Sequence, residues 1–137
     1  MVRFTPVIIA AVYASTVAAT CFSEEGDKCP EYKEEAYYHI RRACYGYEAD
    51  GKHVQGKFED VFFKPYWESP YPATLCVNRG HGSFNFAITN LNGVTGFTLN
   101  SDDCYKRLAA EIHGCDYGGE SDTAGWRFKS DCNADLC

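Results

Sequence analysis

Eight cysteines have the clearest potential for chemistry in this 137-residue chain. An even number of cysteines in a short secreted chain is typical of a disulfide framework, so we expect four disulfides. No Cys-x-x-Cys pair occurs, and we expect no metal site because zinc knuckles require such short paired spacing. Oxidised cysteines also leave no free thiol to act as a nucleophile. The cysteines are Cys21, Cys29, Cys44, Cys76, Cys104, Cys115, Cys132 and Cys137.

The spacing argues against one disulfide, between Cys104 and Cys115. Residues 102–113 are predicted to form a helix, which would place these two cysteines about 16 Å apart along its axis at about 1.5 Å per residue. A disulfide requires Cα atoms within about 7 Å of each other. The other pairings stay open here, since neither the count nor the spacing selects among them.

Histidines and carboxylates could supply acid–base chemistry. No H-E-x-x-H or G-x-S-x-G motif occurs in the sequence. Glu48, His53, Glu59 and Arg79 could be arranged as in small secreted fungal ribonucleases, which use these residue types for acid–base and phosphate chemistry. However, the Tyr-Pro-His strand and the Gly-x-Asp-Arg segment of those enzymes are absent. We therefore predict that the protein is not an enzyme and keep a ribonuclease as the alternative.

Exposed aromatic rings and small polar side chains could bind sugars. Tyr66, Trp67 and Tyr71 lie in a proline-rich stretch, residues 64–72. Aromatic rings contact the apolar faces of pyranoses, while amide and hydroxyl groups bind their hydroxyls in preformed sites. The predicted glycan-binding residues are Tyr66, Trp67, Tyr71, Asn85 and Thr89. In the alternative interpretation the rings cap the core, and Asn85 and Thr89 are solvated or covered by a helix.

The first residues have the pattern of a secretory signal peptide. A short basic start at Arg3 precedes an apolar run, residues 7–14, and the small residues 17–19 follow. The apolar run is shorter than the roughly 20 residues of a membrane span. We expect cleavage after Ala19, an extracellular mature domain over residues 20–137, and no membrane span.

Charge and composition exclude other classes of protein. The chain has 13 basic and 19 acidic residues, a net charge of −6. Because affinity for nucleic acids comes largely from Lys and Arg on phosphates, we expect no nucleic-acid partner. Aromatic residues make up 15% of the sequence, which is too many for a disordered chain. The protein should fold around a core as one domain.

Hydrophobic periodicity predicts an α+β domain. Phe84, Phe86 and Ile88 alternate with Asn85 and Ala87, which indicates an antiparallel strand with one apolar face. Apolar stripes at helical spacing occur before and after the strands. A polar loop is expected to begin at residues 117–119. We predict helices over 30–45 and 102–113, and strands over 58–63, 73–78, 83–90, 97–99 and 125–130.

The second half of the chain, residues 75–137, carries a longer pattern. A helix of the form D-C-x-x-x-L-x-x-E-I-x-x-C is followed by a Gly-Gly loop, an aromatic strand and a terminal cysteine. The residues are Phe84–Asn90, Asp103, Cys104, Leu108, Glu111, Ile112, Gly114, Cys115, Gly118, Gly119, Trp126–Phe128, Asp131, Asn133 and Cys137. This pattern resembles that of the fungal secreted Y3-like glycan-binding proteins. Cys21, Phe22 and the helix ending at Cys44 fit the family more loosely.

The resemblance implies a fold and a way of assembling. It implies an α/β/α sandwich with a central antiparallel sheet, recognition of glycans, and homodimers formed through sheet edges. The chain departs from the family at Cys132, where proline is usual, and at Asp135, where glycine is usual. Cys29 is also additional to the pattern, so we expect Cys29 and Cys132 to pair with each other.

The sequence therefore predicts a secreted, cysteine-rich, lectin-like protein that acts as an effector or a defence toxin. Its partner would be a glycan or a glycoprotein, and no cofactor is expected. The alternatives are a secreted ribonuclease-like protein and an effector that binds a host protein, since a disulfide framework provides durability whatever the ligand.

Overall fold

One interior strand of the main sheet, Gly82–Asn90, organises the fold, because its two faces differ in polarity. The computed structural model describes residues 19–23 and 26–137, so the predicted signal peptide lies outside the described residues except for Ala19. The elements in chain order are β1 Thr20–Cys21, α1 Cys29–Tyr45, β2 Tyr47–Ala49, β3 Lys52–Val54, β4 Phe62–Phe63, β5 Ala73–Arg79, β6 Gly82–Asn90, β7 Phe97–Thr98, α2 Ser101–Gly114, β8 Gly118–Thr123 and β9 Trp126–Asn133.

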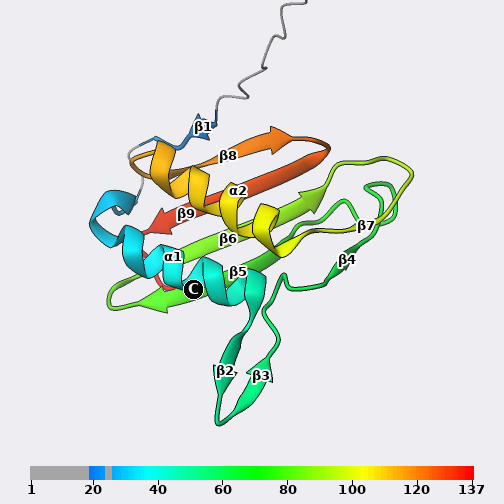
Figure 1. The fold of residues 1–137 in the computed structure, drawn as a ribbon. Helices are drawn as coiled ribbons and strands as arrows, with labels where there is room; N and C mark the ends of the chain where they lie inside the picture. The colour runs from blue at the N-terminus through cyan, green and yellow to red at the C-terminus, as the bar shows by residue number, and fades with distance from the viewer. Residues whose placement is uncertain (1–18, 24–25) are drawn as a thin grey trace, which may run out of the picture.

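The main sheet is antiparallel, with strand order β1-β8-β9-β6-β5. Phe84, Phe86 and Ile88 of β6 and Phe128 of β9 are buried together in one core. Both helices pack on this apolar face, as Figure 1 shows. The predicted α+β class with a central antiparallel sheet is confirmed.

The layers differ from the sandwich that the resemblance implied. In the described residues the two helices share one face of the sheet, and no helix covers the other. The second face of β6 presents Asn85, Ala87 and Thr89, and β9 adds Arg127 and Lys129 beside them. Such a polar face gives a helix no apolar surface to bury, so it stays open.

The two predicted helices are confirmed. Buried Ala36, Ile40 and Ala43 form the apolar stripe of α1. The Asn100 side chain caps α2, since its oxygen accepts hydrogen bonds from the backbone N–H groups of Asp102 at 2.8 Å and Asp103 at 3.3 Å. In the described part of the chain, neither helix is long and apolar enough to cross a membrane.

The predicted hairpin of residues 73–78 and 83–90 is confirmed as β5 and β6. The predicted strand over 58–63 is mostly wrong, because only Phe62 and Phe63 form a strand, β4. This strand pairs with β7 in a separate two-stranded sheet, so the predicted strand over 97–99 forms without joining the main sheet. Phe58 is fully buried at a turn instead. Its aromatic side chain therefore packs in the core although residue 58 lies outside any strand.

The predicted polar loop after Tyr117 is also wrong, because residues 118–123 form β8 in the main sheet. Gly118 has a φ of +83°, and a Cβ there would lie 2.2 Å from the backbone oxygen of Ser130. Glycine therefore lets the chain turn and pair closely with β9. Glu120 and Asp122 of this strand face the open side of the sheet, whereas Ser121 faces α2 and donates a hydrogen bond to Glu111.

Four disulfides connect the helices, the sheet and both ends of the described chain, and no cysteine among the described residues is free. The expected framework is confirmed, as is the prediction that Cys104 and Cys115 do not pair with each other. The hypothesis that Cys29 pairs with Cys132 is also confirmed. The pairs are Cys21–Cys115, Cys29–Cys132, Cys44–Cys104 and Cys76–Cys137.

Removal of the Cys29–Cys132 disulfide should destabilise the protein strongly. It links residues 103 positions apart, and both side chains are fully buried. The double substitution Cys29→Ala and Cys132→Ala should lower the free energy of unfolding by about 3–5 kcal/mol, measured by guanidinium denaturation. The exposed pair Cys76–Cys137 is the matched control. Replacing Cys76 and Cys137 with alanine should lower the free energy of unfolding less, because it leaves no cavity in the core. An equal loss in the two double variants would contradict this prediction.

Glu111 is an acidic residue inside the core. It lies in α2 at 2% exposure. Its Oε1 accepts a hydrogen bond from the Ser121 hydroxyl, whereas no described residue is a partner of Oε2. Burial raises the pKa of the Glu111 carboxyl above its ordinary value of 4.5. The folded protein thus holds this proton more tightly than the unfolded chain does.

This carboxyl should make stability depend on pH. The pKa of the Glu111 carboxyl is higher in the folded state than in the unfolded state. The carboxyl therefore contributes its full stabilisation below about pH 4.5, and this stabilisation is lost as the pH rises through the folded-state pKa. Glu111→Gln should remove this loss and raise the free energy of unfolding at pH 7 by roughly 1 kcal/mol, with little change at pH 3.5. Urea denaturation at both pH values tests this, with exposed Glu34→Gln as the control. A variant less stable than wild type at pH 7 would disprove it.

Candidate functional site

The open face of the sheet carries a cavity beside the proline-rich loop. Its volume is about 170 Å³, and residues from β6, β8, β9 and the loop line it. Strand alternation turns Thr89, Arg127 and Glu120 toward this side, away from the helices. The lining residues are Tyr66, Pro70, Pro72, Ala87, Thr89, Glu120, Arg127 and Lys129.

A buried asparagine holds the loop in place. The Asn90 side-chain amide donates hydrogen bonds to the carbonyl oxygens of Lys64 at 3.1 Å and Thr95 at 3.0 Å. The backbone N–H of Tyr66 also donates to the Asn92 carbonyl at 2.8 Å. These bonds tie the backbone of the loop to the end of β6 and so place Tyr66 beside the cavity.

Ion pairs fix the charged groups of the open face. The Arg127 guanidinium donates to both carboxylate oxygens of Asp122, at 2.7 and 2.9 Å, and lies 3.5 Å from Glu120. The hydrogen bond from Arg127 lowers the pKa of Asp122, and the same bond raises the pKa of Arg127. Lys129 lies 3.4 Å from Asp131. Each cation has a carboxylate partner, so the charges of this face are balanced locally.

The predicted sugar-binding residues divide into three groups. Tyr66 and Thr89 line the same cavity. Asn85 lies on the same face of β6, opposite Asp131 of β9, outside that cavity. Tyr71 lines a neighbouring cavity of about 320 Å³ that shares Pro72 with the first, and Trp67 lines neither.

The three rings are exposed rather than packed into the core. Tyr66, Trp67 and Tyr71 are 43%, 71% and 82% exposed. Sequence patterns do not reveal Glu120 as a site residue, because the polar segment 118–123 has no apolar alternation that would predict a strand. Arg127 and Lys129 are not among the predicted site residues either, although their alternation with the apolar Trp126 and Phe128 places them on the polar face.

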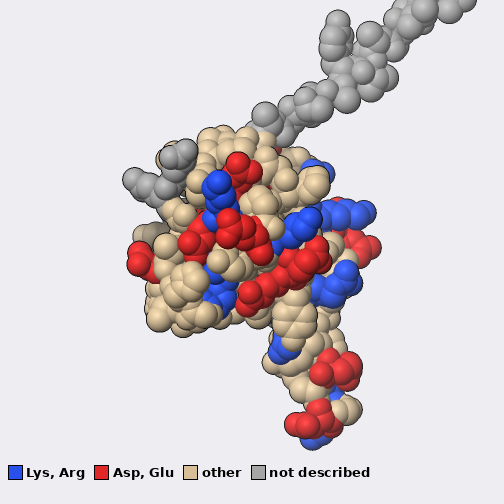
Figure 2. All heavy atoms as spheres, turned by 90° about the vertical axis from the view of Figure 1, so that its left-hand side faces the viewer, with Lys and Arg blue, Asp and Glu red and all other residues tan. Residues whose placement is uncertain are grey.

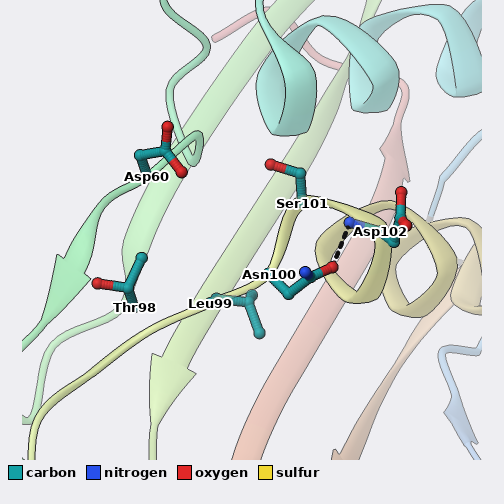
Figure 3. Close-up of a pocket in the computed structure, with 6 residues that line it drawn as sticks. All are labelled: Asp60, Thr98, Leu99, Asn100, Ser101 and Asp102. Carbon is teal, nitrogen blue, oxygen red and sulfur yellow. Dashed lines mark hydrogen bonds between the residues drawn. The ribbon is translucent and has the colours of Figure 1, made fainter.

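Another cavity, of about 450 Å³, lies at the start of α2. Figure 3 shows its lining, with the hydrogen bond from the Asp102 backbone to the Asn100 side chain. The Asp102 carboxylate also accepts a hydrogen bond from Tyr45 at 2.5 Å. The Asn100 side chain therefore serves the helix cap and the Asp102 carboxylate binds Tyr45, while Asp60 stands on the opposite wall. The lining residues are Asp60, Thr98, Leu99, Asn100, Ser101 and Asp102.

Three of the four residues of the ribonuclease alternative come together where the β2–β3 hairpin meets the turn at residues 57–60; Glu48 and His53 lie on the hairpin, which projects from the body in Figures 1 and 2, and Glu59 lies in the turn. His53 Nε2 lies 2.9 Å from Glu59, and Nδ1 lies 3.3 Å from Glu48. The fourth, Arg79, is buried elsewhere, 2.5 Å from Asp27. Carboxylates therefore lie beside both ring nitrogens of His53.

Among the described residues, no group of three or more His, Cys, Asp or Glu side chains is arranged to hold a metal ion. No family model and no curated protein matches the sequence. The resemblance to Y3-like proteins therefore stays a prediction.

The carboxylates around His53 should control its titration. Hydrogen bonds to Glu59 and then Glu48 raise the pKa of His53 above its ordinary value of 6.5. Glu59→Gln should bring this pKa back toward 6.5, and Glu48→Gln should lower it less. NMR titration of the imidazole measures both, with Glu68→Gln as the control. A pKa of 6.5 or below in the wild type would show that the contacts do not form in solution.

Proposed function

We propose that residues 20–137 form a secreted carbohydrate-binding, lectin-like domain, and that its site is the cavity on the open face of the sheet. The observation that carries the proposal is the position of the Tyr66 ring beside Thr89 and the fixed Arg127–Asp122 pair. A pyranose has an apolar face for the ring and hydroxyls for the polar groups. The protein acts by binding and not by catalysis.

The electrostatics of the cavity favour a neutral ligand. Arg127 and Lys129 already have carboxylate partners, so a charged ligand would have to compete with them. Sugar hydroxyls both donate and accept hydrogen bonds, so they can join an existing ion-pair network without breaking it. The resemblance to Y3-like proteins independently supports a glycan or glycoprotein as the partner.

Four disulfides fit an extracellular protein, because such bonds persist in oxidising compartments. Secretion through the signal peptide, a role as an effector or defence toxin, and pairing through sheet edges belong to the same proposal. The edges of the main sheet are β1 and β5. Of these, the seven-residue β5 offers the longer surface for a second copy.

A glycan array with defined variants tests the proposal. The wild-type protein should bind a defined set of glycans. Tyr66→Ala should weaken binding to them about tenfold, because it removes the stacking ring. Thr89→Val, which keeps the shape and removes the hydroxyl, should weaken binding severalfold. Tyr38→Ala is the matched control, since Tyr38 is 52% exposed on α1, away from the cavity.

Three outcomes would contradict the proposal. Glycan binding that Tyr66→Ala and Thr89→Val leave unchanged would place the sugar site elsewhere. RNA cleavage that is lost in His53→Ala or Glu48→Ala would favour the ribonuclease. No glycan binding and no RNA cleavage, with capture of a host protein, would favour the effector that binds a protein.

A further inference from the structure

A further cavity, of about 190 Å³, lies on the helix side of the molecule between α1, β5 and residues 55–57, which lead into the turn at residues 57–60. His39 and Arg42 stand one turn apart on α1, and Lys57 faces them from the turn. Leu75 and Val77 supply apolar surface, because their partners in the sheet, Phe86 and Phe84, also face the helices. The cavity is separate from the proposed sugar site on the opposite face.

The turn is fixed against the helix by a close backbone approach. The N–H of Phe58 donates to the carbonyl oxygen of Ala43 at 2.8 Å. A Cβ on Gly56 would lie 2.3 Å from that same oxygen, so only glycine fits there. This packing brings Lys57 to the cavity that Arg42 lines.

Tyrosines, not carboxylates, hold Arg42 in place. Its guanidinium carbon lies 3.4 Å from the centre of the Tyr47 ring and 5.2 Å from that of Tyr38. Arg42 also donates a hydrogen bond to the Tyr38 hydroxyl. Because rings fix the side chain without neutralising it, its full charge faces the cavity.

The acidic groups nearby leave this charge uncompensated. In the described parts of the chain, no carboxylate forms an ion pair with Arg42 or Lys57. Glu35 lies 3.9 Å from His39. Glu59 accepts hydrogen bonds from the backbone of Gly56 and from His53. Although the net charge of the protein is −6, no carboxylate among the described residues pairs with the positive charges of Arg42 and Lys57 at this cavity.

We propose that this cavity binds an organic oxyanion, a carboxylate, sulfate or phosphate group on an apolar body. Arg42 and Lys57 would bind the oxygens, since a guanidinium presents paired N–H donors that match such groups. Leu75 and Val77 would contact the apolar body. This binding is independent of the proposed sugar binding, because the two sites share no residue.

NMR titration with small anions tests the site. The probes are phenyl phosphate, inorganic phosphate and benzoate at constant ionic strength, followed at the Arg42 Nε–H and the amides of Gln55 and Gly56. Phenyl phosphate should give saturable shifts and bind roughly tenfold more tightly than inorganic phosphate, because its ring buries apolar surface. Benzoate distinguishes carboxylate from phosphate recognition, and saturation by either supports the site.

Matched variants separate the site from general charge effects. Arg42→Gln should weaken phenyl phosphate binding at least tenfold. Arg41→Gln, the adjacent residue whose guanidinium lies 5.0 Å from the Tyr105 ring instead, should leave it unchanged. Arg42→Gln also removes the stacking of Arg42 on Tyr47, which could disturb the fold. Lys57→Gln is therefore a second variant, because the Lys57 side chain is exposed, and it too should weaken phenyl phosphate binding.

The proposal fails if neither phenyl phosphate nor benzoate gives saturable shifts up to high millimolar concentration. It fails equally if Arg41→Gln weakens binding as much as Arg42→Gln does. Equal affinity for phenyl phosphate and inorganic phosphate would overturn the apolar part of the site. None of these results would alter the glycan-array test, which reads a different face of the molecule.

Discussion

The alternation of side chains along β6 is the constraint on which the rest of the molecule depends. Phe84, Phe86 and Ile88 are buried and require both helices to pack on one side. The intervening Asn85 and Ala87 leave the other side polar, with nothing to attract a further layer. One strand therefore decides both where the core lies and which surface stays open to a ligand.

Disulfides stabilise a fold that its small hydrophobic core alone would stabilise only weakly. Cys44–Cys104 links the two helices, and Cys29–Cys132 links the start of α1 to β9. A domain of this size has a free energy of unfolding of only about 5–15 kcal/mol, to which each such crosslink typically contributes about 2–4 kcal/mol. The short strand β1 pairs with β8 over only two residues, and the Cys21–Cys115 disulfide ties it to the end of α2.

Local patterns predicted the elements whose residues repeat with a clear period. The stripe of α2 and the alternation of β6 are such cases. The β2–β3 hairpin was missed although Asp50-Gly51 is a recognisable turn signal, because its strands are short and polar. Asn90 was expected only to end a strand, yet its amide holds the loop that carries Tyr66. That role depends on contacts with residues 64 and 95, which no local pattern reveals.

The net charge of −6 does not predict the local charge on either face of this protein. On the open face Arg127 and Lys129 have carboxylate neighbours, so that surface offers fixed hydrogen-bonding groups with little net field. On the helix side Arg42 lies against the Tyr38 and Tyr47 rings, and among the described residues no carboxylate forms an ion pair with it. Coulomb interactions weaken with distance and are screened beyond about 10 Å in salt. A ligand therefore responds to the charges beside it, and an acidic protein can offer a neutral surface and a cationic one.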